Sequence, residues 1–412
     1  MSKLLSGVAG ATARLRGDER LLVICGSTIL VMAGQGVVGP VLPLFADNFG
    51  ASAALIGLTF SAFGLARMVL NIPAGVFADR RGRRFLLIGG PLVTAVGMLG
   101  SGLSPNIWVL IGFRLVAGAG SALYMTGAQI YLIDIAGPDE RARYIATNQG
   151  ALLAGVSFGP AIGGVLAENF GFRTPFVVVA IGAVLTAVYG WLRLPETRDR
   201  AQAAAEAAAF PVANGVRRSF FLSRQFIAVG LVSTSIFSIR GSRQSLIPLF
   251  ARDEFGFSPG QIGLIFTGLG VVGLLLIAPA GWSADRFGRK SVIIPAGYFS
   301  AVGVIAAAFA PNGTLFVAGL MFSAIGTGIS GPAPAAFVAD IAPSQLRGSA
   351  MGAYRTIGDL GIVLSPPLSG LLADATSIPW ALAANGVLLA AAATWFLVAV
   401  HEQRPAAQTS MR

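Results

Sequence analysis

Long apolar runs alternate with short polar segments along the whole chain. A helix that crosses a bilayer needs about 20 mostly apolar residues, and twelve runs reach that length. Each backbone amide in lipid must be bonded within its own segment, so we expect these runs to be helices. The expected spans are Leu21–Phe45, Ser52–Phe77, Phe85–Leu103, Ile107–Ile133, Tyr144–Leu166, Pro175–Leu194, Gln225–Phe250, Pro259–Ala284, Ser291–Ala310, Thr314–Val338, Gly348–Leu372 and Trp380–Val400.

The longest polar interruption divides the spans into two sets of six. We expect one six-helix bundle over 21–194 and a second over 225–400, joined by a linker over 195–224. The linker begins with Pro-Glu-Thr-Arg and continues as an alanine-rich stretch, which is typical of a spacer. Residues 1–20 and 401–412 flank the bundles.

A ten-residue polar cluster occurs twice. GVFADRRGRR begins at Gly75, after the second run, and GWSADRFGRK begins at Gly281, after the eighth. The copies lie 206 residues apart, and the same shift places Asp134 on Asp340. One shift that aligns separate landmarks indicates two copies of one unit. We expect each cluster to form a tight loop between two spans.

Composition supports a membrane protein and excludes several functions. The chain is 55% hydrophobic and 11% charged, whereas soluble domains carry roughly 25% charged residues. Its only cysteine is Cys25 and its only histidine is His401, which argues against a disulfide, a Cys/His metal site and a histidine-based enzyme. The net charge of +11 is not arranged as a basic stripe with aromatics, so we expect no nucleic-acid partner.

The charges also predict an orientation. With the N-terminus inside, nearly all cations fall in cytoplasmic segments, and the opposite loops hold only Arg173 and Arg252. This asymmetry predicts a multi-pass protein of the plasma (inner) membrane with both termini cytoplasmic. The first apolar run is too long for a cleaved signal peptide. No GxxxxGK[ST] sequence is present, so we expect a membrane gradient, not ATP, to supply energy.

These motifs resemble those of a known family. The repeated Gly-x-x-x-Asp-Arg-x-Gly-Arg-Arg/Lys cluster and the twelve spans resemble the major facilitator superfamily over nearly the whole chain. Arg114, in RLVAGAG, resembles the helix 4 motif, and GVSFGPAIGG from Gly155 resembles the helix 5 signature of its drug/proton antiporters. The resemblance implies an all-α fold of two six-helix bundles, a monomer without cofactor, and export by alternating access.

The repeated cluster suggests a cytoplasmic gate. A carboxylate is stabilised by the N-terminus of a helix, so pseudo-symmetry would place Asp79 near the start of helix 11 and Asp285 near that of helix 5. Arg83 is expected to pair with Asp134, and Arg289 with Asp340. The alternative is that the cations of the cluster serve only to orient the protein in the membrane. The candidate gating residues are Gly75, Asp79, Arg80, Gly82, Arg83, Asp134, Asp285, Arg286, Gly288, Arg289 and Asp340.

The helix 5 signature carries small residues at helical spacing. Gly155, Gly159 and Gly163 lie four apart, so they line one face together with the adjacent Gly164. Pro160 removes a backbone hydrogen bond and bends the helix. The face is either a flexible seam that governs direction or an ordinary packing surface.

Charges inside the spans are the candidate transport residues, because a charge at mid-bilayer costs a few kcal/mol unless it meets a partner or a cavity. Asp359 is interpreted as a proton-titrating carboxylate or, four residues from Arg355, as its ion-pair partner. Arg240 and Arg243 share a helix face and either line a vestibule or pair with Asp47 or Asp253. The candidate set for the substrate and proton route is Arg114, Asp359, Arg355, Arg240, Arg243, Gln35, Tyr124 and Gln149.

Two functions remain open. The first is a secondary transporter that exports a small amphipathic, drug-like compound in exchange for protons, with the substrate near the midplane between the bundles. The second is a transporter of a specific organic anion or metabolite, which the excess of buried arginine favours. Helices 1 and 4 lack the carboxylate that proton-driven members often carry, which weakens the antiport interpretation. A membrane enzyme or sensor without transport is a third, disfavoured hypothesis.

Overall fold

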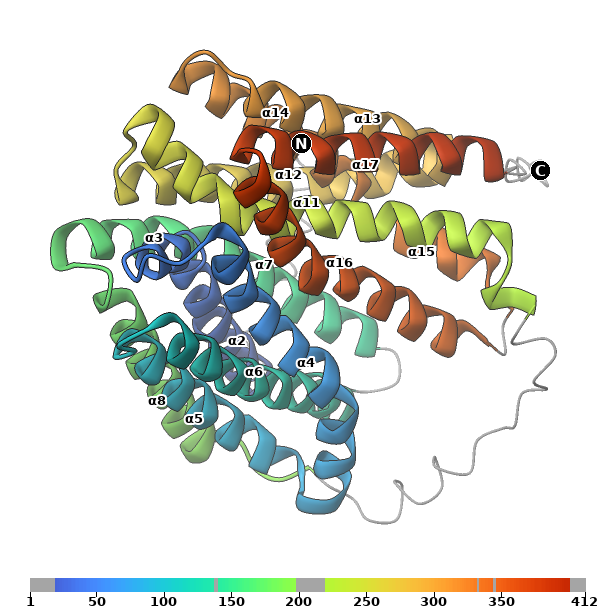
Figure 1. Cartoon of the computed structure of the whole chain (residues 1–412). Helices are drawn as coiled ribbons and strands as arrows, with labels where there is room; N and C mark the ends of the chain where they lie inside the picture. The colour runs from blue at the N-terminus through green and yellow to red at the C-terminus, as the bar shows by residue number, and fades with distance from the viewer. Residues whose placement is uncertain (1–18, 137–139, 198–218, 332, 344–345, 401–412) are drawn as a thin grey trace, which may run out of the picture. The chain divides into compact units, whose positions relative to one another are not determined.

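The computed structural model describes residues 19–136, 140–197, 219–331, 333–343 and 346–400, and all regular structure in these ranges is helical (Figure 1). Residues 1–18 and 401–412, at the two ends of the chain, lie outside the described part, as do residues 198–218 of the expected linker. The helices are α2 Glu19–Val38, α3 Val41–Asp47, α4 Ala53–Arg81, α5 Arg83–Gly102, α6 Ile107–Ile135, α7 Arg141–Phe170, α8 Thr174–Arg193, α11 Arg224–Phe255, α12 Pro259–Phe287, α13 Arg289–Ala308, α14 Gly313–Ser330, α15 Ala333–Ile341, α16 Arg347–Ala375 and α17 Ile378–Ala399.

The first expected span is wrong as a single helix. The run Leu21–Phe45 is divided into α2 and α3 at Gly39 and Pro40. Proline has no backbone N–H and disfavours helical geometry in the residue before it, so the helix ends ahead of Pro40. The tenth span, Thr314–Val338, likewise comprises α14 and α15.

Eleven segments within the described residues are long and apolar enough to cross a membrane. Helix α11 is not among them, although its 32 residues correspond to about 48 Å at 1.5 Å per residue. A hydrocarbon core is about 30 Å thick, so α11 is long enough to cross and is set apart by its polar composition. It is the helix that carries Arg240 and Arg243.

The chain forms two compact units. Unit 1 contains Met1–Phe45 and Ala62–Ala209, and unit 2 contains Ala46–Ser61 and Phe210–Arg412. In unit 1, α2 packs against α7 and α8, and α5 packs against α6 and α8. In unit 2, α11 packs against α16 and α17, and α13 packs against α14 and α17. The second set of pairs is the first set repeated, helix for helix.

The repeat extends to individual contacts. Gly97 of α5 lies so close to α6 that an added Cβ would collide with the backbone of Ala117. Gly303 of α13 is held in the same way against Ser323 of α14. Both pairs are related by the 206-residue shift, which supports a duplicated structural unit.

The segment 46–61 is held within unit 2 by polar contacts. The Asp374 carboxylate near the end of α16 accepts hydrogen bonds from the backbone N–H groups of Ala53, at 2.8 Å, and Ala54, at 3.0 Å. A carboxylate at a helix N-terminus is stabilised by free amides and by the helix dipole. Asp374 therefore caps the first turn of α4.

Candidate functional site

The repeated cluster is mostly helical, which corrects the expected loop. Helix α4 continues through Gly75 to Arg81, and only Gly82 separates it from α5. Gly288 occupies the same position between α12 and α13. Gly82 and Gly288 have φ angles of 96° and 92°, a region that other residues rarely adopt. Each glycine permits an abrupt reversal of direction within a single residue.

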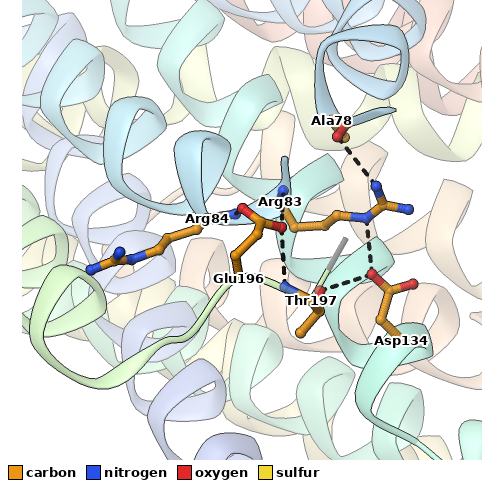
Figure 2. A network of polar contacts seen from close by, with 6 residues as sticks. All are labelled: Ala78, Arg83, Arg84, Asp134, Glu196 and Thr197. Carbon is orange, nitrogen blue, oxygen red and sulfur yellow. Dashed lines mark hydrogen bonds and ion pairs between the residues drawn. The ribbon is translucent and has the colours of Figure 1, made fainter. Parts of the chain in front are cut away.

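Arg83 and Asp134 form the ion pair expected from the sequence. The Arg83 Nε lies 2.9 Å from Asp134 Oδ2, with both side chains largely buried. The guanidinium also donates to the Ala78 carbonyl oxygen of α4, at 3.3 Å. Figure 2 shows Arg83 reaching between Ala78 and Asp134, so one arginine links the end of α4 to the end of α6.

The segment after α8 docks onto the same network. The Glu196 carboxylate accepts hydrogen bonds from the backbone N–H groups of Arg83, at 2.9 Å, and Arg84, at 3.1 Å. Thr197 donates its hydroxyl proton to Asp134 Oδ2, at 2.9 Å (Figure 2). Glu196 therefore caps α5 and fastens the beginning of the linker to the cluster. The sequence analysis assigned these residues to the linker and did not predict their contacts.

The second cluster reproduces part of this network in unit 2. Arg289 pairs with Asp285 and lies 3.3 Å from Asp340, which is the second ion pair expected from the sequence. Lys290 donates to the Leu397 carbonyl oxygen at 2.8 Å. In unit 1, Arg84 donates to the carbonyl oxygen of Trp191, 206 residues before Leu397.

The gating roles themselves remain predictions. The side chains of Asp79 and of Arg347, at the start of α16, lie outside the described part of the structure. Arg80 is exposed, and Arg286 stacks over the Trp282 ring at 5.1 Å. Within its own unit, the Asp285 carboxylate is engaged by Arg289.

Arg114 is buried in unit 1, with 6% of its surface exposed. Its guanidinium lies over the Phe63 ring of α4, 4.6 Å from the centroid. It also approaches the Met98 sulfur of α5, at 3.9 Å. A cation over an aromatic face is attracted by the ring quadrupole. The aromatic and thioether neighbours were not predicted, because neither residue type marks an arginine partner in sequence.

The helix 5 glycines form a close contact between α7 and α2. An added Cβ on Gly159 would lie 2.5 Å from the Ala33 carbonyl oxygen, and one on Gly155 would lie 2.6 Å from that of Ile29. One on Gly163 would collide with Val37. The glycine face of α7 therefore packs directly against the backbone of α2. Pro160 lies within α7 beside this contact, and Gly164 is buried.

The uncharged candidates mostly join helices of unit 1. Gln35 of α2 donates to the Ser121 hydroxyl of α6, at 3.0 Å. The buried Tyr124 hydroxyl shares a 3.0 Å hydrogen bond with Thr28 of α2. Gln149 is half-buried on α7. Gln35 and Tyr124 thus tie α6 to α2.

The pairing of Asp359 with Arg355 remains a prediction. Asp359 is half-buried and has an interaction within the folded chain, and Arg355 is exposed. The carboxylates proposed for Arg240 and Arg243 are taken by a different arginine. Arg252 lies 2.9 Å from Asp47 and 2.6 Å from Asp253.

The fold and the duplicated network define a multi-pass, all-helical membrane protein, with no cluster of metal ligands in the described ranges. The family model of the Major Facilitator Superfamily matches residues 24–250 and 232–411. The chain belongs to this superfamily, whose members are transporters and not enzymes.

The chain is similar to several curated transporters over most of its length. An uncharacterized MFS-type transporter of Methanocaldococcus jannaschii is 25% identical over 88% of this chain and 93% of its own. Multidrug resistance protein 2 of Bacillus subtilis is 26% identical over 86% of this chain and 88% of its own length. The class C tetracycline resistance protein of Escherichia coli is 27% identical over 93% of this chain and 96% of its own length.

Solved structures agree with the fold. A bacterial homolog of the human lysosomal transporter Spinster superposes with a TM-score of 0.80 at 18% identity, covering 92% of this chain and 96% of its own. The human organic anion transporter MFSD10 gives a TM-score of 0.64 at 16% identity, and the match covers 91% of this chain and 98% of MFSD10. At such identities the likeness concerns the fold alone.

Proposed function

We propose that the protein exports small amphipathic, drug-like compounds in exchange for protons by alternating access. The observation that carries this proposal is the similarity to transporters named for drug resistance. These include the multidrug and tetracycline resistance proteins and the quinolone resistance protein NorA of Staphylococcus aureus, which is 24% identical over 87% of this chain. The helix 5 signature resembling that of drug/proton antiporters supports the outward direction.

The proposed energy source is the proton gradient across the inner membrane. Asp359 is the candidate carboxylate, because it lies half-buried within a span and carboxylates inside membrane helices serve as proton relays in pumps and transporters. Protonation from one side and release to the other would couple proton entry to export of the compound.

The test of export is flux in proteoliposomes over a panel of neutral, cationic and anionic aromatic compounds, with and without a pH gradient. We expect gradient-dependent movement of some members of the panel. Absence of flux for the whole panel under both conditions would contradict the proposed function.

The test of coupling is Asp359→Asn. This variant should lose the acceleration by the pH gradient and keep downhill flux, because the amide cannot carry a proton. Asp374→Asn is the matched control on the same helix, since Asp374 caps α4 and should not titrate with transport. Full pH-driven flux in Asp359→Asn would show that the proton site is elsewhere.

A further inference from the structure

Helix α11 carries its charge where a spanning helix should be most apolar. Arg240 lies 16 residues after Arg224, the first residue of α11, which is about 24 Å along the axis and near the middle of the helix. Arg243 follows within one turn. Charged residues near mid-bilayer cost several kcal/mol and persist where they have a partner or a function. The polar centre of α11 therefore needs an explanation.

Arg243 has hydrogen-bond donors that no described protein group satisfies. Its Nε and one terminal nitrogen, Nη1, are both buried, and neither has an acceptor among the described residues. A buried donor that makes no hydrogen bond costs about 1–3 kcal/mol, and more when the group is charged. The folded chain thus holds a guanidinium with two buried donors that are available to an acceptor.

The surroundings of Arg243 add positive charge. Arg240 lies within electrostatic range of Arg243 and stacks over the Phe237 ring at 5.4 Å, without an ion pair in the described ranges. Like charges three residues apart on a helix repel each other. Tyr354 of α16 lies within electrostatic range of both Arg240 and Arg355.

The nearby polar groups do not neutralise this charge. Tyr354 is buried, and its hydroxyl oxygen accepts a 3.0 Å hydrogen bond from the hydroxyl of Ser233. Asp359, one turn after Arg355 on α16, supplies a single carboxylate against three arginines and already has an interaction of its own. A net positive charge remains between α11 and α16 within unit 2.

The duplicated architecture does not require these arginines. The residues 206 positions before Arg240 and Arg243 are Gly34 and Val37 of α2. In unit 1, α2 packs against α7 and α8 as α11 packs against α16 and α17, so the same helix arrangement forms without a cation. Arg240 and Arg243 are therefore additions to the second half and not elements of the common framework.

We propose that Arg240 and Arg243 form an anion subsite on α11 that binds the carboxylate, or a similar planar anionic group, of an amphipathic cargo. A guanidinium offers parallel N–H donors that match a carboxylate in a bidentate pair. The Phe237 ring on the preceding turn offers an apolar surface beside the anion. This inference rests on the proposed transport function and narrows its cargo to amphipathic compounds that carry an acidic group.

The experiment measures binding to the purified full chain in lipid nanodiscs by equilibrium dialysis, without a gradient. The probes are matched pairs of an aryl acid and its uncharged amide: 1-naphthoate with 1-naphthamide, 2-naphthoate with 2-naphthamide, and 4-phenylbutyrate with 4-phenylbutyramide. We expect the acid to bind at least about tenfold more tightly than the amide in one or more pairs, as for hydrogen bonds to a charged group.

The variants assign that preference to α11. Arg243→Gln should bring acid and amide to near parity, and Arg243→Lys should keep part of the preference because it keeps the charge without the fork. Arg252→Gln is the control, since it removes a cation from the same helix that already pairs with Asp47 and Asp253, and it should keep the preference. If Arg243→Gln does not fold, as judged by gel filtration and thermal unfolding, Arg240→Gln replaces it with the same expectation.

Two results would overturn the subsite: acids that bind no tighter than amides in every pair, or a preference that survives Arg243→Gln. Failure of the proposed export is distinguishable from failure of the subsite. An Arg243-dependent preference without gradient-driven flux would reject export and keep the subsite. Gradient-driven flux of neutral or cationic compounds without any acid preference would reject the subsite alone.

Discussion

At the scale of single residues, the end of unit 1 where α4 meets α5 depends on a carboxylate from the linker. Glu196 accepts hydrogen bonds from two backbone N–H groups at the start of α5, where its carboxylate occupies the space that a side chain on Gly82 would take. Thr197 and Arg83 meet on Asp134 beside it. A change in this linker would therefore reach the ends of α4, α5 and α6 together.

Replacing Glu196 with alanine should destabilise unit 1 by about 1 kcal/mol, the typical cost of a lost helix cap. The measurement is thermal unfolding in detergent. Glu254→Ala is the control, because Glu254 is an exposed carboxylate at the end of α11 and should change the midpoint little. Equal midpoints for Glu196→Ala and the parent chain would show that the cap does not contribute to stability.

At the scale of helices, the glycine face of α7 brings its backbone against that of α2. The contact needs residues without a side chain, because an added Cβ on Gly155 or Gly159 meets a carbonyl oxygen and not a flexible side chain. Close approach through small residues is how helices associate where lipid offers no hydrophobic driving force. This packing role is visible in the structure and is compatible with the predicted role in direction.

Two glycines of the same helix should respond in opposite ways to alanine. Gly159→Ala should destabilise the protein by about 1–3 kcal/mol, because the new methyl group overpacks a backbone contact. Gly150→Ala should be neutral or stabilise by up to about 1 kcal/mol, since nothing lies within 4 Å of its added Cβ and alanine favours a helix. Thermal unfolding of the two variants, measured in parallel, tests the pair; an equal loss in both would contradict the contact.

At the scale of the whole chain, duplication is the main organising feature. Helix pairs, the Arg–Asp pairs after the positive-φ glycines and the Gly97 and Gly303 contacts recur at one offset. The halves differ in the buried and half-buried charges within their spans, which are Arg67 and Arg114 in the first and Arg240, Arg243 and Asp359 in the second. We infer that duplication supplies the framework and that these differences supply the selectivity.

The predicted orientation can be tested by thiol labelling in intact cells. In a Cys25→Ser background, a cysteine at Pro105, between α5 and α6, should react with a membrane-impermeant maleimide, because that segment is predicted to face outward. A cysteine at Arg81, beside the cytoplasmic turn, should react only after permeabilisation. Both positions are exposed, and the reverse pattern would invert the topology.

Some of the site was readable from sequence because it depends on local patterns. Charge spacing and the 206-residue shift predicted the Arg83–Asp134 and Arg289–Asp340 pairs. Glu196, Asp374, Phe63 and Met98 were missed, since nothing in the sequence marks a capping carboxylate, an aromatic ring or a thioether as the partner of one particular group. Sequence periodicity carries no record of which helix end a distant carboxylate meets.

The sequence by itself determined the membrane environment, the duplicated helical fold and the family, because apolar length and repeated motifs are properties of short stretches of chain. Only the tertiary structure decided the partners of the charges outside the repeated cluster. It assigned Asp47 and Asp253 to Arg252 and left the donors of Arg243 without a protein acceptor in the described ranges. Pairing depends on distances between side chains brought together by packing, and no pattern along one chain fixes those distances.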